Sequence, residues 1–268
     1  MQNCKIISVY IQKGGCAKTT TAATIARLIA RSGERKNVLL IDTDPQANLT
    51  TSFGVKTQNF ATLYDAFTGR ESDHPASDFI ANIEPELDII PADERIKELD
   101  DVLSGRLSRE KLLKKFLERR IDVHRRYDYV IIDCPPSGGI LPLNALTASD
   151  YVLIPVTAEY LSLNGYIKLR KMIAEIQDEL NPSLKVLGVV ITRFSASRRG
   201  MKKSHKDIEA ALQQSCGDLL FNTRIRENAR IMDAPRYATT VTDYAPESNG
   251  AEDYANLAKE IIQRLKKD

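Results

Sequence analysis

The stretch Lys13-Gly14-Gly15-Cys16-Ala17-Lys18-Thr19 lies between a short β-rich run and a helical pattern. It ends in the Lys-Thr pair of a phosphate-binding loop, although Gln12 and Ala17 stand where the GxxxxGK[ST] pattern has glycine. Gly14 and Gly15 let backbone N–H groups turn toward an anion, and the following helix points the positive end of its dipole at it. The pattern KGGxxKT in this context predicts a variant phosphate loop.

Two side chains of this loop have defined tasks in a nucleotide site. Lys18 is expected to neutralise the β and γ phosphate oxygens, and the Thr19 hydroxyl to ligate Mg²⁺. The alternative is a Gly-Gly turn with two surface lysines, which the strand–loop–helix context disfavours. The thiol of Cys16 is expected to be reactive when the site is empty, because Lys13 and Lys18 are near, and to be covered by bound Mg-ATP.

Apolar runs alternate with amphipathic stretches along the rest of the chain. Continuous apolar strands separated by helices predict a parallel sheet covered on both faces. We therefore expect one doubly wound α/β domain over residues 1–268, with a mostly parallel central sheet. Residues 92–127 are highly charged and are predicted as an insertion of two helices broken at Ser104-Gly105. The expected strands are 5–11, 38–41, 87–90, 129–132, 151–155, 185–192 and 219–221, and the other expected helices are 19–31, 162–180, 201–214 and 251–265.

Aspartates follow two of the predicted strands. Asp42 and Asp44 come after the run 38–41, and Asp133 closes the run 129–132 in the Walker B pattern. Ligands of open α/β sheets bind at the carboxyl ends of the strands. Asp133 is expected to reach Mg²⁺ directly or through water, while of the other two, one holds the metal's water shell and one orients the attacking water. A polar strand end or helix cap is the alternative for each.

The composition places the chain among ordinary globular proteins, with 268 residues, 43% hydrophobic and 28% charged. A net charge of +2 does not by itself indicate a nucleic-acid binder, so any basic footprint must be local. The four cysteines form no CxxC pair or zinc spacing, which favours free thiols in a reducing cytoplasm. No apolar run approaches the ~20 residues that span a bilayer, and no signal peptide is expected.

Together these motifs resemble the ParA/Soj family of partition ATPases, within the wider group that includes MinD. The resemblance implies ATP hydrolysis with ATP and Mg²⁺ as cofactors, in an ATP-dependent sandwich homodimer. It also implies non-specific binding of double-stranded DNA, association with the nucleoid when ATP is bound, and release when a ParB-type centromere-binding partner stimulates hydrolysis. The segments that carry it are KGGCAKTTTAATIARLIA, LLIDTDPQANLTTSFG, DYVIIDCPPS, PVTAEYLSLNGY, NTRIRENARIMDAPRY and YAPESNGAEDYANLAKEI.

The resemblance also assigns roles to single residues. Lys13 would be the signature lysine that reaches the partner subunit's nucleotide, and Lys18 the lysine that acts within its own subunit. Asp44 would position the hydrolytic water, with Asp42 near the metal. The implied catalytic residues are Lys13, Lys18 and Asp44, the metal ligands Thr19, Asp42 and Asp133, and the ATP contacts Lys13, Gly14, Gly15, Cys16, Ala17, Lys18, Thr19, Thr20, Thr192, Arg193 and Arg226.

Two features depart from the family pattern. Ala17 replaces the glycine that usually precedes the catalytic lysine, and Arg226 stands where relatives often have a proline near the adenine. Larger partition ATPases also carry an N-terminal helix-turn-helix domain. This chain enters its first predicted strand at residue 5, so we expect no such domain and no sequence-specific operator binding.

Basic residues gather in the segments 193–206 and 224–236. Such clusters suit phosphate backbones, although a solvated basic face is the alternative and is favoured for the insertion, where acidic residues are interspersed. The resemblance ties Arg230, and either Arg198 or Arg199, to DNA. The predicted DNA-binding residues are Arg198, Arg199, Lys202, Lys203 and Arg230.

Three other functions remain to be weighed against DNA partition. A MinD-like, membrane-cycling regulator of cell division needs an amphipathic C-terminal anchor, and residues 261–268 contain only three large apolar side chains. An iron–sulfur ATPase needs cluster-ligating cysteines, and Cys134 has no companion at a suitable spacing. A small-molecule kinase is disfavoured by the lysine-variant loop and the basic segments. DNA partition is therefore the preferred interpretation.

Overall fold

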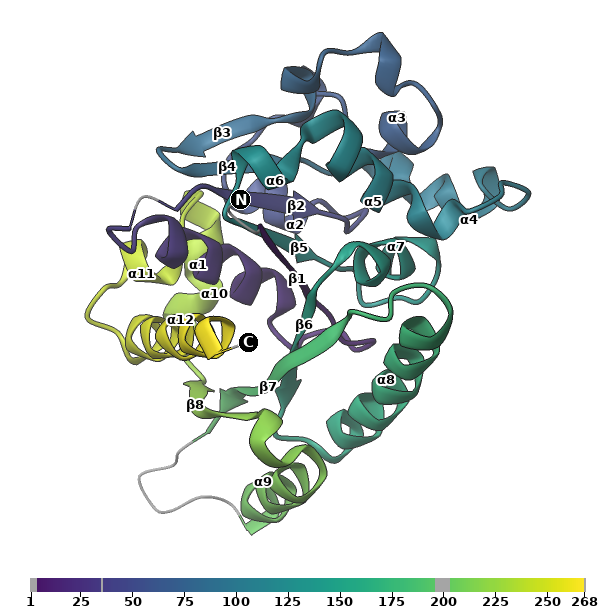
Figure 1. Cartoon of the computed structure of the whole chain (residues 1–268). Coiled ribbons are helices and arrows are strands. Elements are labelled where there is room, and N and C mark those ends of the chain that lie inside the picture. Colours follow the sequence, from purple (N-terminus) through teal and green to yellow (C-terminus); the bar gives the residue numbers. More distant parts are fainter. Residues whose placement is uncertain (1–3, 35, 196–202, 268) are drawn as a thin grey trace.

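The computed structural model describes residues 4–34, 36–195 and 203–267 (Figure 1). Within them, eight strands form one sheet in the order β3-β4-β2-β5-β1-β6-β7-β8. Every pairing is parallel except that between β3 and β4. The strands are β1 Lys5–Val9, β2 Val38–Asp42, β3 Ala81–Glu84, β4 Leu87–Ile90, β5 Tyr129–Asp133, β6 Tyr151–Thr157, β7 Lys185–Phe194 and β8 Leu220–Arg226.

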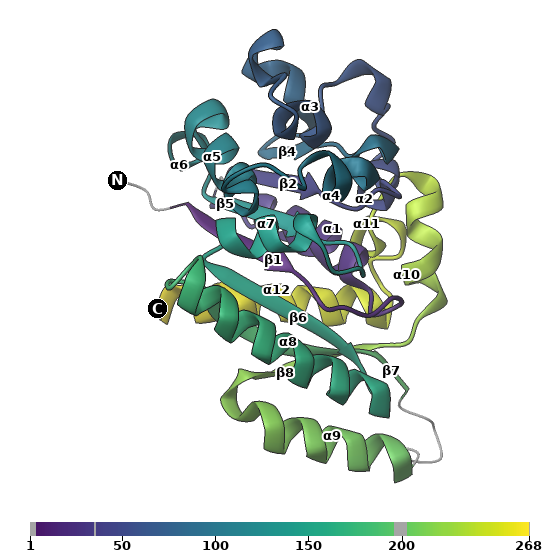
Figure 2. The same ribbon diagram turned by 90° about the vertical axis from the view of Figure 1, so that its right-hand side faces the viewer.

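Helices cover both faces of this sheet. Helices α1 and α12 lie on one face, and α7 and α8 lie on the other (Figures 1 and 2). Buried apolar residues form one cluster on each side of the sheet, as a doubly wound fold requires. The helices are α1 Lys18–Ala30, α2 Asn48–Ser52, α3 Leu63–Phe67, α4 Leu99–Val102, α5 Leu112–Phe116, α6 Val123–Arg126, α7 Ile140–Ala148, α8 Tyr160–Glu179, α9 Lys203–Cys216, α10 Ala229–Asp233, α11 Val241–Tyr244 and α12 Asn249–Lys267.

The register of the central strands brings the predicted site together. Strand β1 pairs with β5 on one side and β6 on the other, so the phosphate loop leaves the middle of the sheet. In the β2–β5 pair, Asp42 lies opposite Asp133, and in the β1–β5 pair Val9 lies opposite the same aspartate. Two acidic strand ends and the loop therefore share one edge, where ligands bind in this class of fold.

The predicted fold class is confirmed, but several elements differ from expectation. The final strand runs over Leu220–Arg226 rather than ending at 221, and β3 was not predicted. The insertion consists of α4, α5 and α6 joined by 3₁₀ and π turns rather than two helices. Ser108 and Asp122 adopt left-handed backbone angles (φ 55° for each), which interrupt helical geometry in this segment.

Strand β3 forms one edge of the sheet. It has only four residues, pairs antiparallel with β4, and its register shifts between Asn82 and Glu84. The Glu84 carboxylate accepts hydrogen bonds from Arg27 at 3.3 Å and from Arg31 at 2.9 Å. A short, irregular and charged strand therefore ends the sheet on this side.

Candidate nucleotide site

The phosphate loop connects β1 to α1, and α1 begins at Lys18. Ala17, immediately before the helix, has φ 60° and ψ 32°, and Gly15 has φ 75°. A left-handed conformation costs an ordinary residue about 1 kcal/mol and costs glycine little. This difference explains why the resembling family usually has glycine at the position of Ala17. Ala17 adopts this turn at a conformational cost that glycine would largely avoid.

Lys18 is buried and folds back on its own loop. Its Nζ donates a hydrogen bond to the backbone carbonyl of Lys13 at 2.8 Å. Burial lowers the pKa of Lys18, and the nearby Asp133 carboxylate opposes that effect. An entering phosphate would offer this ammonium a stronger, charged acceptor than the carbonyl it now holds.

The side chain of Lys13 pairs with an acidic residue of the same chain. Its Nζ lies 2.6 Å from the Glu159 carboxylate and 3.3 Å from Thr157 Oγ1. The ammonium beside it lowers the pKa of Glu159. The predicted signature lysine is therefore held at the end of β6, beside its own phosphate loop.

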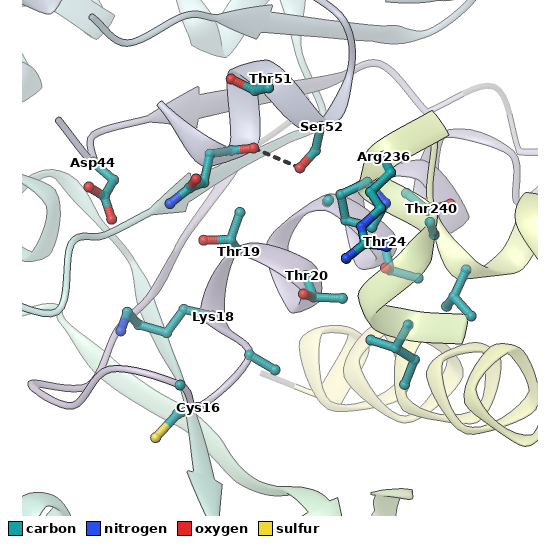
Figure 3. Close-up of a pocket in the computed structure, with 18 of the residues that line it drawn as sticks. Cys16, Lys18, Thr19, Thr20, Thr24, Asp44, Thr51, Ser52, Arg236 and Thr240 are labelled. Carbon is teal, nitrogen blue, oxygen red and sulfur yellow. Dashed lines mark hydrogen bonds between the residues drawn. The ribbon is translucent and has the colours of Figure 1, made fainter. Parts of the chain in front are cut away.

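Thr192 and Cys16 support the loop from behind. The fully buried Thr192 hydroxyl lies 3.2 Å from the carbonyl oxygens of both Cys16 and Val156, so it joins the loop to β6 rather than lining the cleft. The Cys16 thiol is also fully buried and points away from Lys18 and Thr19 (Figure 3). Burial raises its pKa, with the two loop lysines opposing. The burial of this side chain in the core therefore argues against the predicted reactive thiol, whose reactivity stays a prediction.

Asp42 is fully buried with both carboxylate oxygens engaged. One oxygen accepts a hydrogen bond from Asp44 N at 3.0 Å, and the other accepts from Thr50 N at 2.9 Å and Thr50 Oγ1 at 2.8 Å. Burial raises the pKa of Asp42 to about 6, and these hydrogen bonds oppose the rise. The geometry suits a residue that fixes the chain after β2, because a direct metal bond would have to replace one of these contacts.

Asp133 differs from Asp42 in the hydrogen bonding of its carboxylate. Both of its carboxylate oxygens are buried, and neither has a hydrogen-bond partner among the described residues. Burial and the neighbouring Asp42 carboxylate raise the pKa of Asp133 well above the ordinary value. The nearby Thr19 hydroxyl partly offsets this rise, although its geometry does not form a hydrogen bond with the carboxylate. A buried carboxylate without a partner is costly, and a cation with its water shell would satisfy it. Asp133 and Thr19 therefore fit the predicted Mg²⁺ site.

Asp44 lies at the cleft itself. It follows β2, is largely buried, and one carboxylate oxygen accepts a hydrogen bond from Gln46 N at 2.9 Å. Lys18, Thr19 and Asp44 lie around one end of the cleft, as Figure 3 shows. A carboxylate held by its neighbour's N–H and facing this space can orient a water molecule.

Two adjoining cavities meet at the loop. The larger, about 580 Å³, is lined by the loop, Asp44, α2 and the segment from α10 to α11. The smaller, about 340 Å³, shares Gly15, Ala17 and Thr20 and adds Arg193 and Arg226. Because the smaller cavity adjoins the phosphate loop, its position suits the base and ribose of a bound nucleotide. The lining residues that sequence reasoning did not name are Ile225, Glu227, Asn228, Ile231, Met232, Pro235 and Tyr254.

The Arg226 guanidinium is already engaged at this smaller cavity. It lies 2.6 Å from the Asp253 carboxylate and 2.7 Å from Glu252, both on α12. Arg193 lies 3.8 Å from Glu227. Arg226 thus joins β8 to α12 and presents to the cavity a side chain whose charge is neutralised by two carboxylates.

The predicted DNA-binding residues are placed only in part. Arg198, Arg199 and Lys202 lie outside the described residues, and Lys203 is described only as the first residue of α9. Arg230 is exposed on α10, and its guanidinium lies 5.9 Å from the centre of the Tyr244 ring. Of the other arginines in its segment, Arg224 pairs with Glu209 at 2.9 Å, and Arg226 is held by α12.

Comparison with known proteins gives consistent matches. A family model described as an AAA domain matches residues 4–186. The chain is 37% identical to the chromosome partitioning protein ParA of Caulobacter vibrioides, over 97% of this chain and 94% of that protein. It is 38% identical to the sporulation initiation inhibitor protein Soj of Bacillus subtilis, over 96% and 98%. The structure of cobyrinic acid a,c-diamide synthase from Mycobacterium smegmatis with bound ADP and magnesium matches with a TM-score of 0.81 at 29% identity, covering 98% of this chain and 96% of that one.

The fold and the cleft define a P-loop ATPase with a lysine-variant loop, in which the loop, Asp44 and Asp133 meet at the carboxyl edge of one mostly parallel sheet. Within this class of ATPases, the chain shares its sequence with the two partition proteins over nearly their whole length. The chain belongs to the ParA/Soj family of partition ATPases, which confirms the resemblance carried by its motifs.

Replacing Asp133 with asparagine tests the metal site. Because its pKa is raised on folding, Asp133 binds protons more tightly in the folded than in the unfolded chain, so its contribution to stability falls as pH rises above about 4. In EDTA, the melting temperature of the wild type should therefore fall relative to that of Asp133→Asn as pH is raised toward 7. The variant should also lose Mg²⁺-dependent ATPase activity. If the melting temperatures of the two proteins change equally with pH, or if the variant keeps its Mg²⁺-dependent ATPase activity, Asp133 does not belong to a metal site.

Proposed function

We propose that this chain is a DNA-partition ATPase that binds ATP with Mg²⁺ and alternates between DNA-bound and free states. The observation that carries the proposal is a cleft lined by Lys18, Thr19 and Asp44 in a member of the partition family. Beside it lies the buried carboxylate of Asp133, which has no hydrogen-bond partner among the described residues. The related Mycobacterium smegmatis structure holds ADP and magnesium, which supports the choice of cofactors. The chain is proposed to act as one domain in the cytoplasm.

The proposed mechanism follows from the residues at the cleft. Lys18 would leave the Lys13 carbonyl and neutralise the β and γ phosphate oxygens. Thr19 and Asp133 would hold Mg²⁺, whose charge offsets that of the phosphates. Asp44 would orient the attacking water, and Asp42 would keep Asp44 in place through its hydrogen bond to the backbone. Binding and hydrolysis thus depend on different residues of one cleft.

The proposed homodimer gives Lys13 a second partner. In the single chain its ammonium is paired with Glu159, and 23% of the Lys13 side chain and 61% of the Glu159 side chain are exposed. Exposed ion pairs contribute about 0.2–1 kcal/mol, so this contact can be exchanged at low cost. We infer that Lys13 leaves Glu159 to reach the nucleotide of a second subunit when ATP-bound chains associate.

DNA binding is proposed to use Arg230 together with the basic segment 198–203. Arg230 is exposed and is not held by a carboxylate in any ion pair among the described residues, whereas Arg224 and Arg226 are. Phosphate contacts of this kind position a protein without reading sequence. The ATP-bound dimer would therefore associate with the nucleoid, and a ParB-type partner would stimulate hydrolysis and release it.

A MinD-like membrane cycle is the second candidate, and the C-terminal helix argues against it. Helix α12 packs on α1 and β8, and Leu257, Ile261 and Leu265 on it are buried. These apolar side chains contribute to the core rather than to a free amphipathic face. No helix in the described parts of the chain is long and apolar enough to cross a membrane.

The DNA proposal is tested by a salt titration with Arg230→Ala. Each lost phosphate contact reduces the slope of log K against log salt by about 0.9, so a symmetric dimer should lose roughly 1.8. The loss should be equal on two unrelated duplexes, while ATP binding stays normal. Arg119→Ala, an exposed arginine of the insertion, is the matched control and should leave the slope unchanged.

The same titration is run without nucleotide and with ADP, ATP and a nonhydrolysable analogue. DNA binding only with ATP or its analogue supports the partition cycle. An unchanged slope in Arg230→Ala would make this arginine part of a solvated face. Absence of DNA binding in every nucleotide state, with ATPase activity intact, would contradict the proposed function.

A further inference from the structure

The insertion before β5 contacts the chain just after β5. Asp100 lies on α4, and one of its carboxylate oxygens accepts a hydrogen bond from Ile140 N at 2.9 Å. Ile140 is the first residue of α7, and the residue before it is Gly139, which has no side chain to cap the helix. Helix α7 therefore takes its N-terminal cap from a residue 40 positions earlier. Helices α4 and α7 lie side by side in Figures 1 and 2.

The contact leaves little free space. Gly139 has φ 102° and ψ −164°, a conformation that is accessible essentially only to glycine. A Cβ added at this position would lie 2.6 Å from one Asp100 carboxylate oxygen and 3.0 Å from the other. The carboxylate and the glycine thus fit closely, and each restricts where the other can lie.

The segment 134–139 that ends at this contact belongs to the nucleotide cleft. It begins directly after Asp133, and Pro136 lines the same cavity as Lys18 and Asp44. The Tyr10 hydroxyl donates a hydrogen bond to the Ser137 carbonyl at 3.1 Å. The segment is therefore fixed at two points. Tyr10 is fully buried in the core, whereas Asp100 is exposed on the insertion.

We propose that Asp100 is a positioning residue for ATP hydrolysis. By capping α7, its carboxylate sets where the segment 134–139 enters the cleft, and with it the distance between Pro136 and the reacting end of the triphosphate. The effect should fall on turnover rather than on ATP affinity, because Asp100 does not line the nucleotide cavity and no hydrogen bond among the described residues joins it to the phosphate loop. This inference rests on the ATPase activity of the family and is independent of DNA binding.

The test measures ATPase kinetics without DNA for Asp100→Ala and Asp100→Asn. If the cap of α7 is needed in the transition state, its loss should lower kcat about fivefold. Asp100→Ala should show this fall with KM for ATP unchanged. Asparagine keeps an acceptor oxygen and should restore most of kcat. Asp101→Ala, which removes the same charge from the next residue of α4, should behave as the wild type.

Gly139→Ala keeps the proposal testable if Asp100→Ala does not fold. Alanine at position 139 is strained by the backbone conformation, and its methyl would also displace the carboxylate, so kcat should fall in the single variant for both reasons. In a background that lacks the carboxylate, such as Asp100→Ser, the methyl meets less obstruction, so the two losses should be less than additive. Unchanged kcat in folded Asp100→Ala, equal losses in Asp101→Ala, or additive losses in the double variant would each overturn the proposal. Those outcomes would leave the DNA-partition function untouched.

Discussion

Lys18→Ala is expected to weaken ATP binding by about 100-fold, because each hydrogen bond to a charged group contributes about 1.5–3 kcal/mol. Lys18 is the buried ammonium at the start of α1, and it donates a hydrogen bond to a backbone carbonyl of its own loop. Its removal leaves the phosphates without their principal countercharge from this chain. It also leaves Asp133 without the nearby positive charge that opposes its raised pKa.

Titration of a fluorescent ATP analogue into the purified variant measures this loss directly. Lys56→Ala removes the same charge from an exposed position and is the matched control. A melting curve without nucleotide separates lost binding from lost folding, since only the ATP-dependent stabilisation should disappear. ATP affinity equal to that of the wild type in a folded Lys18→Ala variant would contradict the phosphate-loop assignment.

Asp44→Ala is expected to retain ATP binding and to lose turnover by about 100-fold, the lower end of the range for a positioned base. The Asp44 carboxylate faces the cleft, and among the described residues it accepts a hydrogen bond from the backbone N–H of Gln46. The substitution therefore costs little structure. Since ATP would bind without being cleaved, the variant should accumulate as an ATP-bound dimer that remains on DNA.

Single-turnover hydrolysis and ATP affinity are measured together on this variant. Asp42→Ala provides the contrast, because Asp42 makes three hydrogen bonds inside the fold and its loss should lower the melting temperature as well as activity. If Asp44→Ala hydrolyses ATP at the wild-type rate, the water is oriented elsewhere, and Asp42 is the next candidate. A weakened ATP affinity with a wild-type rate at saturating ATP would assign Asp44 to binding rather than to hydrolysis.

The sequence was sufficient for the parts of the site that are local in the chain. The loop before α1 and the aspartates after β2 and β5 follow short patterns, and a parallel sheet brings such strand ends to one edge. Long-range contacts were not predictable in this way. The hydroxyl of Thr192 bonds the loop from 176 residues away, and Asp100 accepts a hydrogen bond from Ile140 N, 40 residues along the chain. No local pattern encodes these distances.

The charged residues show the same limit. In the sequence, Arg224, Arg226 and Arg230 form one basic segment, but the fold pairs the first with α9 and the second with α12. Arg230 remains exposed, as does Arg236 later in the same segment, because both follow the end of β8. Strand β3 was also missed, since Ala, Asn and Glu, three of its four residues ANIE, are depleted in strands and only Ile83 favours one.

The β3 edge has a consequence for how copies of this chain behave when they are crowded. An exposed edge strand can template the addition of another strand and so start aggregation. Here the edge is four residues long, is interrupted by its register shift, and carries Glu84 with two bound arginines. A second sheet would find few aligned backbone groups and a charged obstacle. The β3 edge therefore offers neighbouring copies of the chain a poor template for adding a strand.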